Sequence, residues 1–343
     1  MAGSEGWVPH RSGRARSTVL AFAAILVLYG SYPASAQSKR LGLETRIVLP
    51  DVKGRIDHLA FDPARQRLFV AELGNNTVDV IDMKAGKAVQ RLTGLREPQG
   101  LGYVPQTDTL YVANAGDGSV RLYNGESLTP SGRLDLGEDA DNVRVSPQGD
   151  RVYIGHGSGA IAVLEPATAT KLADIPLKGH PEGFQVDASS ARVYVNVPDV
   201  DEVAVLDLHV TRQVAAWPTG AVRAVFPMAL DGEAHEVIVV GRRPPKLLAY
   251  DTEAGRVKTS LDVCGDADDV FVDSKRHRLY VSCGEGVLDV FERTGASYAR
   301  VQSVPTAPGA RTALLAPSMD WLVVAAPARD GKSASLLLFR PLP

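Results

Sequence analysis

Short segments in which apolar and polar residues alternate recur along most of the chain. Alternation with a period of two is typical of a β-strand with one buried face. Each recurrence contains an apolar segment centred on an aromatic or aliphatic anchor, and successive anchors lie 41 to 44 residues apart. The anchors are Phe69, Tyr111, Tyr153, Tyr194, Ile238, Tyr280 and Val323. So regular a period indicates one structural unit repeated seven times.

Each unit is predicted to contain four strands. An alternating segment such as HLAFD at 58–62 lies about ten residues before the anchor, and segments such as TVDVID at 77–82 and AVQRLTG at 88–94 follow it. In the fifth unit the first segment is AVFPM at 224–228, which lies three residues further from its anchor and predicts an insertion of three residues. No stretch has a useful helical period of 3.6 residues.

Four-stranded units of this length, repeated seven times, predict an all-β, seven-bladed β-propeller that occupies residues 37–343 as one domain. The seventh unit, from Ala310 to Pro343, supplies only three strands. The missing outer strand is predicted at 44–49 (ETRIVL). We therefore expect the N-terminal strand to close the last blade, which leaves no open edge between the first and last blades.

Three segments carry a resemblance to a known family: LYVANAG at 110–116, VYVNVP at 193–198 and LYVSCG at 279–284. They resemble the YVTN repeat, and residues 41–343 are similar to the YncE-like family of exported bacterial propellers. The resemblance implies the propeller fold but no single activity, because related propellers include lactonases, a streptogramin-type lyase and subunits linked to quinoprotein dehydrogenases. The fifth unit departs from the pattern at Ile238 and at RRPPK, 242–246.

Residues 1–36 have the order of a secretory signal peptide. Three arginines precede the apolar run 18–29, and Ala34-Ser35-Ala36 forms a small-residue cleavage site. The run is short for a membrane span, although an uncleaved anchor is the alternative. The mature protein is expected to be a periplasmic or secreted monomer without a membrane span.

Composition and charge narrow the classes of partner. The chain is 22% charged and 45% hydrophobic, as an ordinary globular protein is. Its net charge of −3 becomes −5 once three Arg and one Glu leave with the signal peptide. This balance disfavours nucleic acid as a partner.

The two cysteines exclude a Cys-rich scaffold or metal cluster. Cys264 precedes the first predicted strand of the sixth blade, and Cys283 ends the second, so both should lie on the same face of that blade. We expect a disulfide between them, which would hold the loop at 266–269. A thiolate pair that binds copper is the alternative.

The loops that lead into each first strand and out of each second strand share one face of a propeller, at the mouth of the central channel. Aligning them places an acidic arc opposite an arc formed by Arg223, Arg242, Arg243 and Arg311. Such arginines could bind a carboxylate or phosphate, although a merely water-filled polar mouth is the alternative. The predicted ligand-binding residues are Arg55, Asp57, Gln99, Asp141, Asn142, Glu182, Arg223, Arg242, Asp268, Asp269 and Arg311.

Three histidines, His58, His156 and His180, are predicted on the same face, close to carboxylates. They are candidate ligands for a divalent metal, and His58 and His180 are candidate catalytic acid–base residues. Structural histidines that form hydrogen bonds are the alternative. No His-x-His or His-Glu-x-x-His spacing specifies a metal, and no other cofactor is indicated.

Three functions fit these features. The first is an exported binding protein that holds a small anionic ligand, or a periplasmic protein partner, at the channel mouth. The second is a lactonase- or lyase-type enzyme in which Arg223 or Arg311 stabilises an oxyanion. The third is an accessory protein of a periplasmic metal or redox system, with the two cysteines at the metal.

Overall fold

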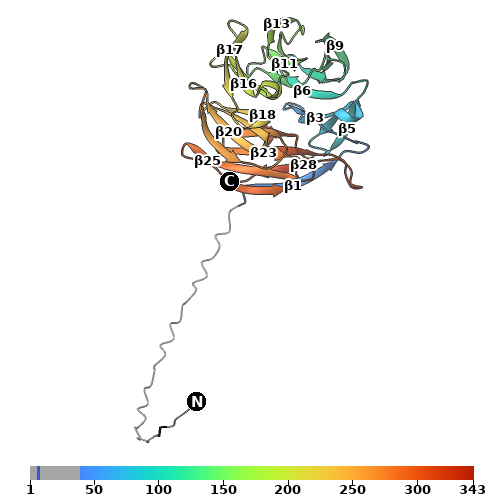
Figure 1. The fold of residues 1–343 in the computed structure, drawn as a ribbon. Helices are drawn as coiled ribbons and strands as arrows, with labels where there is room; N and C mark the ends of the chain where they lie inside the picture. The colour runs from blue at the N-terminus through green and yellow to red at the C-terminus, as the bar shows by residue number, and fades with distance from the viewer. Residues whose placement is uncertain (1–5, 8–38) are drawn as a thin grey trace, which may run out of the picture. The chain divides into compact units, whose positions relative to one another are not determined.

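Residues 39–343 form a ring of seven four-stranded antiparallel sheets (Figure 1). The computed structural model describes residues 6–7 and 39–343, and the ring belongs to a compact unit that begins at Ser38. The all-β, seven-bladed propeller predicted from the repeats is therefore confirmed. The predicted signal peptide lies outside the described residues, apart from Gly6 and Trp7.

The strands of the first four blades follow, from the channel outward. Blade one contains β2 (Leu59–Asp62), β3 (Arg67–Glu72), β4 (Thr77–Asp82) and β5 (Lys87–Leu92). Blade two contains β6 (Pro98–Val104), β7 (Thr109–Asn114), β8 (Ser119–Asn124) and β9 (Pro130–Asp135). Blade three contains β10 (Val143–Val145), β11 (Val152–His156), β12 (Ala160–Leu164) and β13 (Lys171–Pro176). Blade four contains β14 (Phe184–Asp187), β15 (Arg192–Val197), β16 (Glu202–Asp207) and β17 (Arg212–Pro218).

The other three blades follow the same plan. Blade five contains β18 (Arg223–Asp231), β19 (Glu236–Arg243), β20 (Pro245–Asp251) and β21 (Val257–Asp262). Blade six contains β22 (Ala267–Asp273), β23 (Arg278–Cys283), β24 (Val287–Thr294) and β25 (Ser297–Pro305). Blade seven contains β26 (Ala313–Ala316), β27 (Trp321–Ala326), β28 (Ser335–Pro341) and β1 (Leu41–Val48). Three short 3-10 turns are η1 (Leu73–Asn75), η2 (Pro198–Val200) and η3 (Pro317–Met319).

The N-terminal strand closes the ring as predicted, although it begins three residues earlier than the apolar pattern suggested. β1 pairs antiparallel with β28, from Leu41 opposite Pro341 to Val48 opposite Ser335 (Figure 1). Beyond the strand, the Leu342 N–H donates to the Arg40 carbonyl at 2.8 Å. Leu41 is completely buried, which explains why the strand includes it.

The fifth blade corrects one sequence prediction. In blade one, Ala60 pairs with the anchor Phe69, and in blade five Ala229 pairs with the anchor Ile238, so the spacing is the same. The prediction of a three-residue insertion is wrong, because residues 227–231 correspond to 58–62 of blade one, three residues later than AVFPM was placed. β18 also has a β-bulge between Val225 and Met228, as β6 of blade two has between Pro98 and Leu101. A bulge bends a strand and redirects its side chains.

Hydrophobic clusters fill the spaces between neighbouring blades. The anchors Phe69, Tyr111 and Tyr280 are completely buried, and each packs in one of these clusters. One cluster joins blades one and two through Phe69, Leu101 and Tyr103, among others. Each blade buries its two faces against its neighbours, which explains why the same apolar anchor recurs in every repeat.

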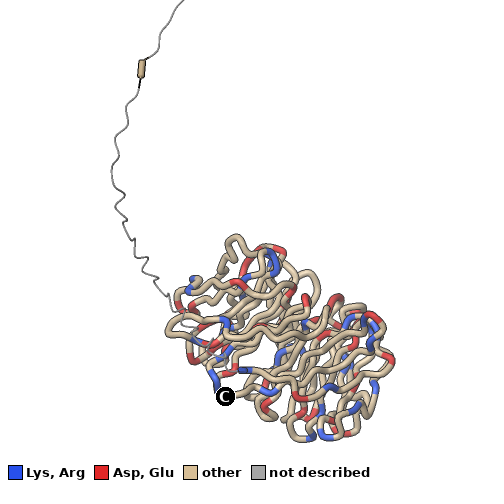
Figure 2. The backbone as a smooth tube through the Cα atoms, turned by 90° about the horizontal axis from the view of Figure 1, so that it is seen from below, with Lys and Arg blue, Asp and Glu red and all other residues tan. Residues whose placement is uncertain are grey.

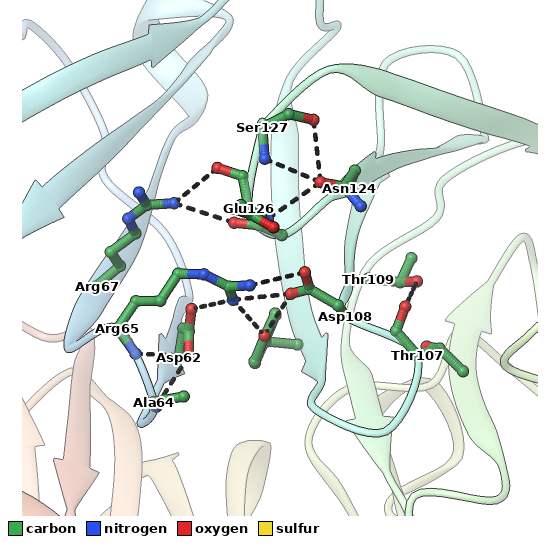
Figure 3. Close-up of polar contacts among 12 residues, drawn as sticks. Asp62, Ala64, Arg65, Arg67, Thr107, Asp108, Thr109, Asn124, Glu126 and Ser127 are labelled. Atoms are coloured by element: carbon green, nitrogen blue, oxygen red, sulfur yellow. Dashed lines mark hydrogen bonds and ion pairs between the residues drawn. The ribbon is translucent and has the colours of Figure 1, made fainter.

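Arginine bridges tie neighbouring blades together at the turns between their first and second strands. Arg65 of blade one donates through both terminal nitrogens to the Asp108 carboxylate of blade two, each at 2.8 Å (Figure 3). Asp62 accepts from the same guanidinium at 2.9 Å and from two backbone N–H groups of its own turn. Asp62 therefore forms the kind of turn that an Asp-Pro sequence favours. The same arrangement recurs between blades six and seven, where Arg276 bridges to Asp320.

Charged residues of both signs are interspersed along the tube, without a large region of one sign (Figure 2). This distribution agrees with the near balance of 37 basic and 40 acidic residues. Within residues 6–7 and 39–343, no helix has the length and apolar character that a membrane crossing needs.

Substitutions in β1 test the closure of the ring. Leu41→Ala removes a completely buried side chain, so we expect it to lower the free energy of unfolding by about 2–5 kcal/mol. Leu43 lies two residues away in the same strand and is 50% exposed. Leu43→Ala should change the free energy by no more than about 0.5 kcal/mol.

Denaturant unfolding of both variants, followed by circular dichroism, provides the measurement. Equal effects at the two positions would mean that β1 does not dock against β28.

Candidate functional site

The loops at the channel mouth surround an outer pocket of about 490 Å³ between blades four and five. It is bounded by the loop before β14, η2, the bulged start of β18 and the end of β19. Its lining residues are His180, Glu182, Pro198, Asp199, Asp201, Arg223, Ala224, Phe226 and Arg243. The predicted face therefore does carry a concave site, and it is centred on two blades rather than on the ring axis.

A smaller inner cavity of about 20 Å³ lies on the axis of the ring. It shares Glu182 and Phe226 with the outer pocket. Of the predicted ligand-binding residues, seven line it: Arg55, Asp57, Asp141, Asn142, Glu182, Asp268 and Asp269. The candidate catalytic His58 lines it as well. Gln99 is buried at the start of β6 and lines neither space.

The register of β18 against β19 decides which residue of blade five faces the axis. Arg223 was predicted at the ring position that Asp57 and Asp141 occupy in blades one and three. The strand register instead gives that position to Phe226, two residues before Met228, while Arg223 lies further out and pairs with Arg243. Ala224 adopts a left-handed φ of 53° beside the bulge, a conformation that non-glycine residues seldom adopt outside functional or tightly held loops.

Blades four and five approach each other closely at this point. The Gly183 N–H donates to the Phe226 carbonyl at 2.9 Å. A Cβ atom on residue 183 would lie only 2.4 Å from that oxygen. A glycine is therefore required for the two inner strands to meet and for Phe226 to reach both spaces.

The arginine arc and the acidic arc neutralise each other directly. Arg311 contacts Asp268 through Nε at 3.0 Å and Asp266 through Nη1 at 3.0 Å. Arg242 binds the same two carboxylates, with Nε 3.2 Å from Asp266, and it donates to the Ala267 carbonyl at 2.8 Å. Two of the arginines expected to clamp a ligand are thus occupied by the loop of blade six. The alignment had not singled out Asp266, because its role depends on how blades five to seven meet.

Burial perturbs the acids of the inner cavity. It raises the pKa of Asp57, an effect that Asp141 and Asp268 increase and that Arg55, 2.7 Å away, opposes. It also raises the pKa of Asp269 to about 7, although His58 and a hydrogen bond from the Ala313 N–H oppose the shift. Glu182 has a raised pKa for the same reason, reinforced by Asp141. These carboxyl groups therefore hold their protons more strongly than carboxyl groups in water.

Asp141 is the exception because it has cationic neighbours. Burial alone would raise its pKa, but the contacts with His180 and the charges of His58 and Arg55 outweigh burial and lower it. The His180 Nε2 lies 4.0 Å from the Asp141 carboxylate, and Nδ1 lies 2.7 Å from the Gly157 carbonyl. Although burial opposes the change, these contacts raise the pKa of His180. His180 is therefore a cation near neutral pH.

The buried oxygens Asp141 Oδ1 and Asn142 Oδ1 have no hydrogen-bond partner within the described residues. Both residues line the inner cavity. A cavity of about 20 Å³ is large enough for one water-sized group. The axis of the ring is therefore a polar position suited to a single small hydrogen-bond donor.

The three candidate metal histidines are not gathered at one point. His58 lies 3.8 Å from Asp57 at the axis, and His180 lies in the wall of the outer pocket. His156 is 2.7 Å from Asp174 on the outer strand β13 instead. In the part of the chain that the structure describes, no group of three or more His, Cys, Asp or Glu is arranged to hold a metal ion. A bound divalent metal stays an untested hypothesis.

The predicted disulfide between Cys264 and Cys283 is confirmed, with the Cα atoms 5.9 Å apart. The two cysteines are therefore not a thiolate pair. The Cys264 N–H donates to the Asp289 carboxylate at 2.9 Å. The cross-link anchors both ends of the segment that presents Asp266, Asp268 and Asp269 to the channel mouth.

Comparisons with solved structures confirm the propeller fold. One match is a chain of the Kuenenia stuttgartiensis hydrazine synthase, with a TM-score of 0.72 and 18% identity over 81% of this chain and 94% of that chain. Another is a chain of the mitotic checkpoint complex, with a TM-score of 0.76 and 14% identity over 94% of this chain and 98% of that chain. At these identities the similarity shows the fold alone.

No protein-family model matches the sequence, and no curated protein matches it either. The resemblance to the YncE-like family therefore stays a prediction, while the seven-bladed propeller itself is established by the strand pairing.

Breaking the disulfide should destabilise the whole ring. The cysteines are 19 residues apart in sequence, and loop-closure entropy assigns such a cross-link about 3 kcal/mol. We expect the double variant Cys264→Ser/Cys283→Ser to lose about this much free energy of unfolding, measured by denaturant titration under non-reducing conditions. A reducing agent should then destabilise the natural protein but not the variant. A natural protein that is insensitive to reduction would contradict the expectation.

The acids of the inner cavity should make stability depend on pH in an unusual direction. Because the pKa of Asp269 is about 7 in the folded chain and about 4 when unfolded, the folded state binds more protons between these values. The contribution of Asp269 to the free energy of unfolding should therefore fall as the pH rises from about 4 to about 7.

Denaturant titrations at pH 5 and pH 7.5 measure this dependence. Asp269→Asn should reduce the difference between the two pH values. Asp330→Asn is the control, because the Asp330 side chain is 82% exposed, and it should leave the difference unchanged. An Asp269→Asn variant with the full pH dependence would contradict the assignment.

Proposed function

We propose that the chain is an exported binding protein that holds a small anionic molecule in the outer pocket. The observation that carries this proposal is a pair of arginines in the pocket wall. Arg223 and Arg243 lie directly opposite each other on β18 and β19, and both line the pocket. Like charges directly opposite on neighbouring strands repel each other. An anion bound between them would relieve that repulsion.

Only one of these two arginines is neutralised by the protein. Arg223 forms an ion pair with Asp201, at 3.0 Å. Arg243 is exposed, and no carboxylate of the described residues lies within 4.0 Å of it. Its guanidinium is therefore free to bind a carboxylate or a phosphate through two hydrogen bonds, the geometry that arginine favours.

The opposite wall supports the same ligand class. Contacts with Asp141 and the Gly157 carbonyl outweigh burial and raise the pKa of His180, which favours its cationic form. Burial raises the pKa of Glu182, which favours its neutral, hydrogen-bond-donating form. The Asp199 carboxylate already accepts a hydrogen bond from the backbone N–H of His180, at 3.0 Å. Phe226 adds an apolar surface. The ligand we propose is a small carboxylate or phosphate with an apolar part that contacts Phe226, and the pocket volume suits it.

Export is the second part of this proposal. The order of residues 1–36 and the resemblance to exported YncE-like propellers support it, and the Cys264–Cys283 disulfide fits a chain that matures in an oxidising compartment. A protein partner on the same face, instead of a small molecule, is the alternative within this proposal.

The lactonase or lyase hypothesis uses the same pocket with His180 as the acid–base group. His180 is the better placed of the two candidate histidines, because it lines the outer pocket while His58 lines the inner cavity. Hydrolysis of a panel of lactones that depends on His180 would favour this activity over simple binding.

A melting-temperature screen of small carboxylates, sugar acids and phosphates tests the binding function. For the compounds that stabilise the protein, calorimetry should show that Arg243→Ala weakens binding at least tenfold, because a charge-assisted hydrogen-bonding group is lost. Arg212→Ala is the matched control, since Arg212 is an exposed arginine at the start of β17 and does not line the pocket.

Equal affinities in the two arginine variants would refute the outer pocket as the anion site. If no compound of these classes stabilises the protein, the small-molecule proposal fails, and a protein partner becomes the ligand to test.

A further inference from the structure

The central channel continues on the far side of the inner cavity as a separate space of about 270 Å³, here called the lower channel. It is lined by side chains of the inner strands, and most of them are apolar. The apolar lining residues include Phe61, Leu101, Val145, Met228, Phe271 and Leu314. Most residues that line the lower channel are thus apolar, whereas charged residues predominate in the lining of the inner cavity above it.

Arg144 stands where the charged and the apolar spaces meet. It lines both the inner cavity and the lower channel, together with His58, Met228 and Asp269. The function proposed above does not use it. Burying the Arg144 guanidinium at the end of this channel costs desolvation free energy, so its position is not explained by stability alone.

The contacts of Arg144 leave part of its guanidinium unused. Nε donates to the Phe184 carbonyl at 3.1 Å and Nη1 to the Val143 carbonyl at 3.0 Å. The guanidinium also lies over the Phe184 ring, 5.6 Å from its centre. No hydrogen bond of Nη2 and no carboxylate within ion-pair distance is found among the described residues. Burial lowers the pKa of this guanidinium, although Asp269 and Asp141 oppose the effect from longer range.

We propose that the lower channel is a second binding site, which takes a small monocarboxylate with an apolar, preferably aromatic, body. The carboxylate accepts hydrogen bonds from Arg144, and the body lies between Phe61, Phe271 and Leu314. This site is distinct from the outer pocket, and the proposal does not depend on the function assigned to that pocket.

The chemistry of the walls selects this ligand class. A bound carboxylate would pair with a charge that the protein leaves without an ion pair, which is the favourable way to bury such a group. A phosphate dianion is disfavoured because Asp269, which shares the wall with Arg144, would repel its second negative charge. The Gln185 amide is not available as a further donor, because it already donates to the Met228 carbonyl at 2.8 Å. The volume lies just below the range of drug-sized pockets, so the body must be small.

Calorimetry with benzoate as the probe tests this site, with acetate and benzyl alcohol as controls. Acetate has the charge without the body, and benzyl alcohol has the body without the charge. Benzoate should bind at least tenfold more tightly than either. Equal binding of benzoate and benzyl alcohol would overturn the role of Arg144.

Three variants then locate the site. Arg144→Met should weaken benzoate binding at least tenfold. Leu314→Trp should do the same from the opposite wall by filling the channel, so the test does not rest on a single variant. Benzoate also fits the ligand class proposed for the outer pocket, so both variants are compared with Arg243→Ala, which removes the outer-pocket arginine. Arg212→Ala, at an exposed arginine that lines neither space, is the control and should leave benzoate binding unchanged. Benzoate binding that is lost in Arg243→Ala but unchanged in Arg144→Met and Leu314→Trp would overturn the second site and assign benzoate to the outer pocket.

Discussion

Seven innermost strands must meet around one axis, and this crowding is the constraint on which the rest of the structure depends. It is visible where blades two and three touch, since a Cβ atom on Gly100 would lie 1.9 Å from the Asp141 carbonyl. Gly183 has the same function between blades four and five. Backbones that approach this closely leave room on the axis only for selected side chains, and those side chains cannot be well solvated.

The electrostatics of the channel mouth follow from that crowding. Four loops, from blades one, three, four and six, bring carboxyl groups to one axis. These groups either have a raised pKa, as Asp269 does, or are matched by cations, as Asp141 is by His180. Arg242 and Arg311 compensate the acidic loop of blade six. Most charged groups at the channel mouth are therefore neutralised by other groups of the protein. Arg243 and Arg144, which lack such compensation, stand out as the residues with capacity for a ligand.

The architecture could be predicted from the sequence because every blade repeats one local pattern. The regular spacing of the anchors from Phe69 to Val323 can be measured in the sequence without knowledge of tertiary contacts. The sequence also shows that the last repeat lacks its fourth strand, which β1 supplies. Ring positions could be predicted only where the register was regular. In blade five, AVFPM fits period-two alternation, yet the inner strand pairs with β19 three residues further along the chain, so Phe226 takes the place expected for Arg223. The pairing of Arg242 and Arg311 with Asp266 depends on how three blades meet, which no local pattern encodes.

The hydrogen bond from Leu342 to Arg40 has a topological consequence. It places the two ends of the ring side by side, so the order of the blades in space does not depend on where the chain is cut. A short linker from residue 343 to residue 39, with new ends opened in an exposed turn such as that at Gly86, would give a circular permutant with the same seven sheets. In such a permutant blade seven would be formed by continuous chain, and the clasp between distant segments would become an ordinary hairpin.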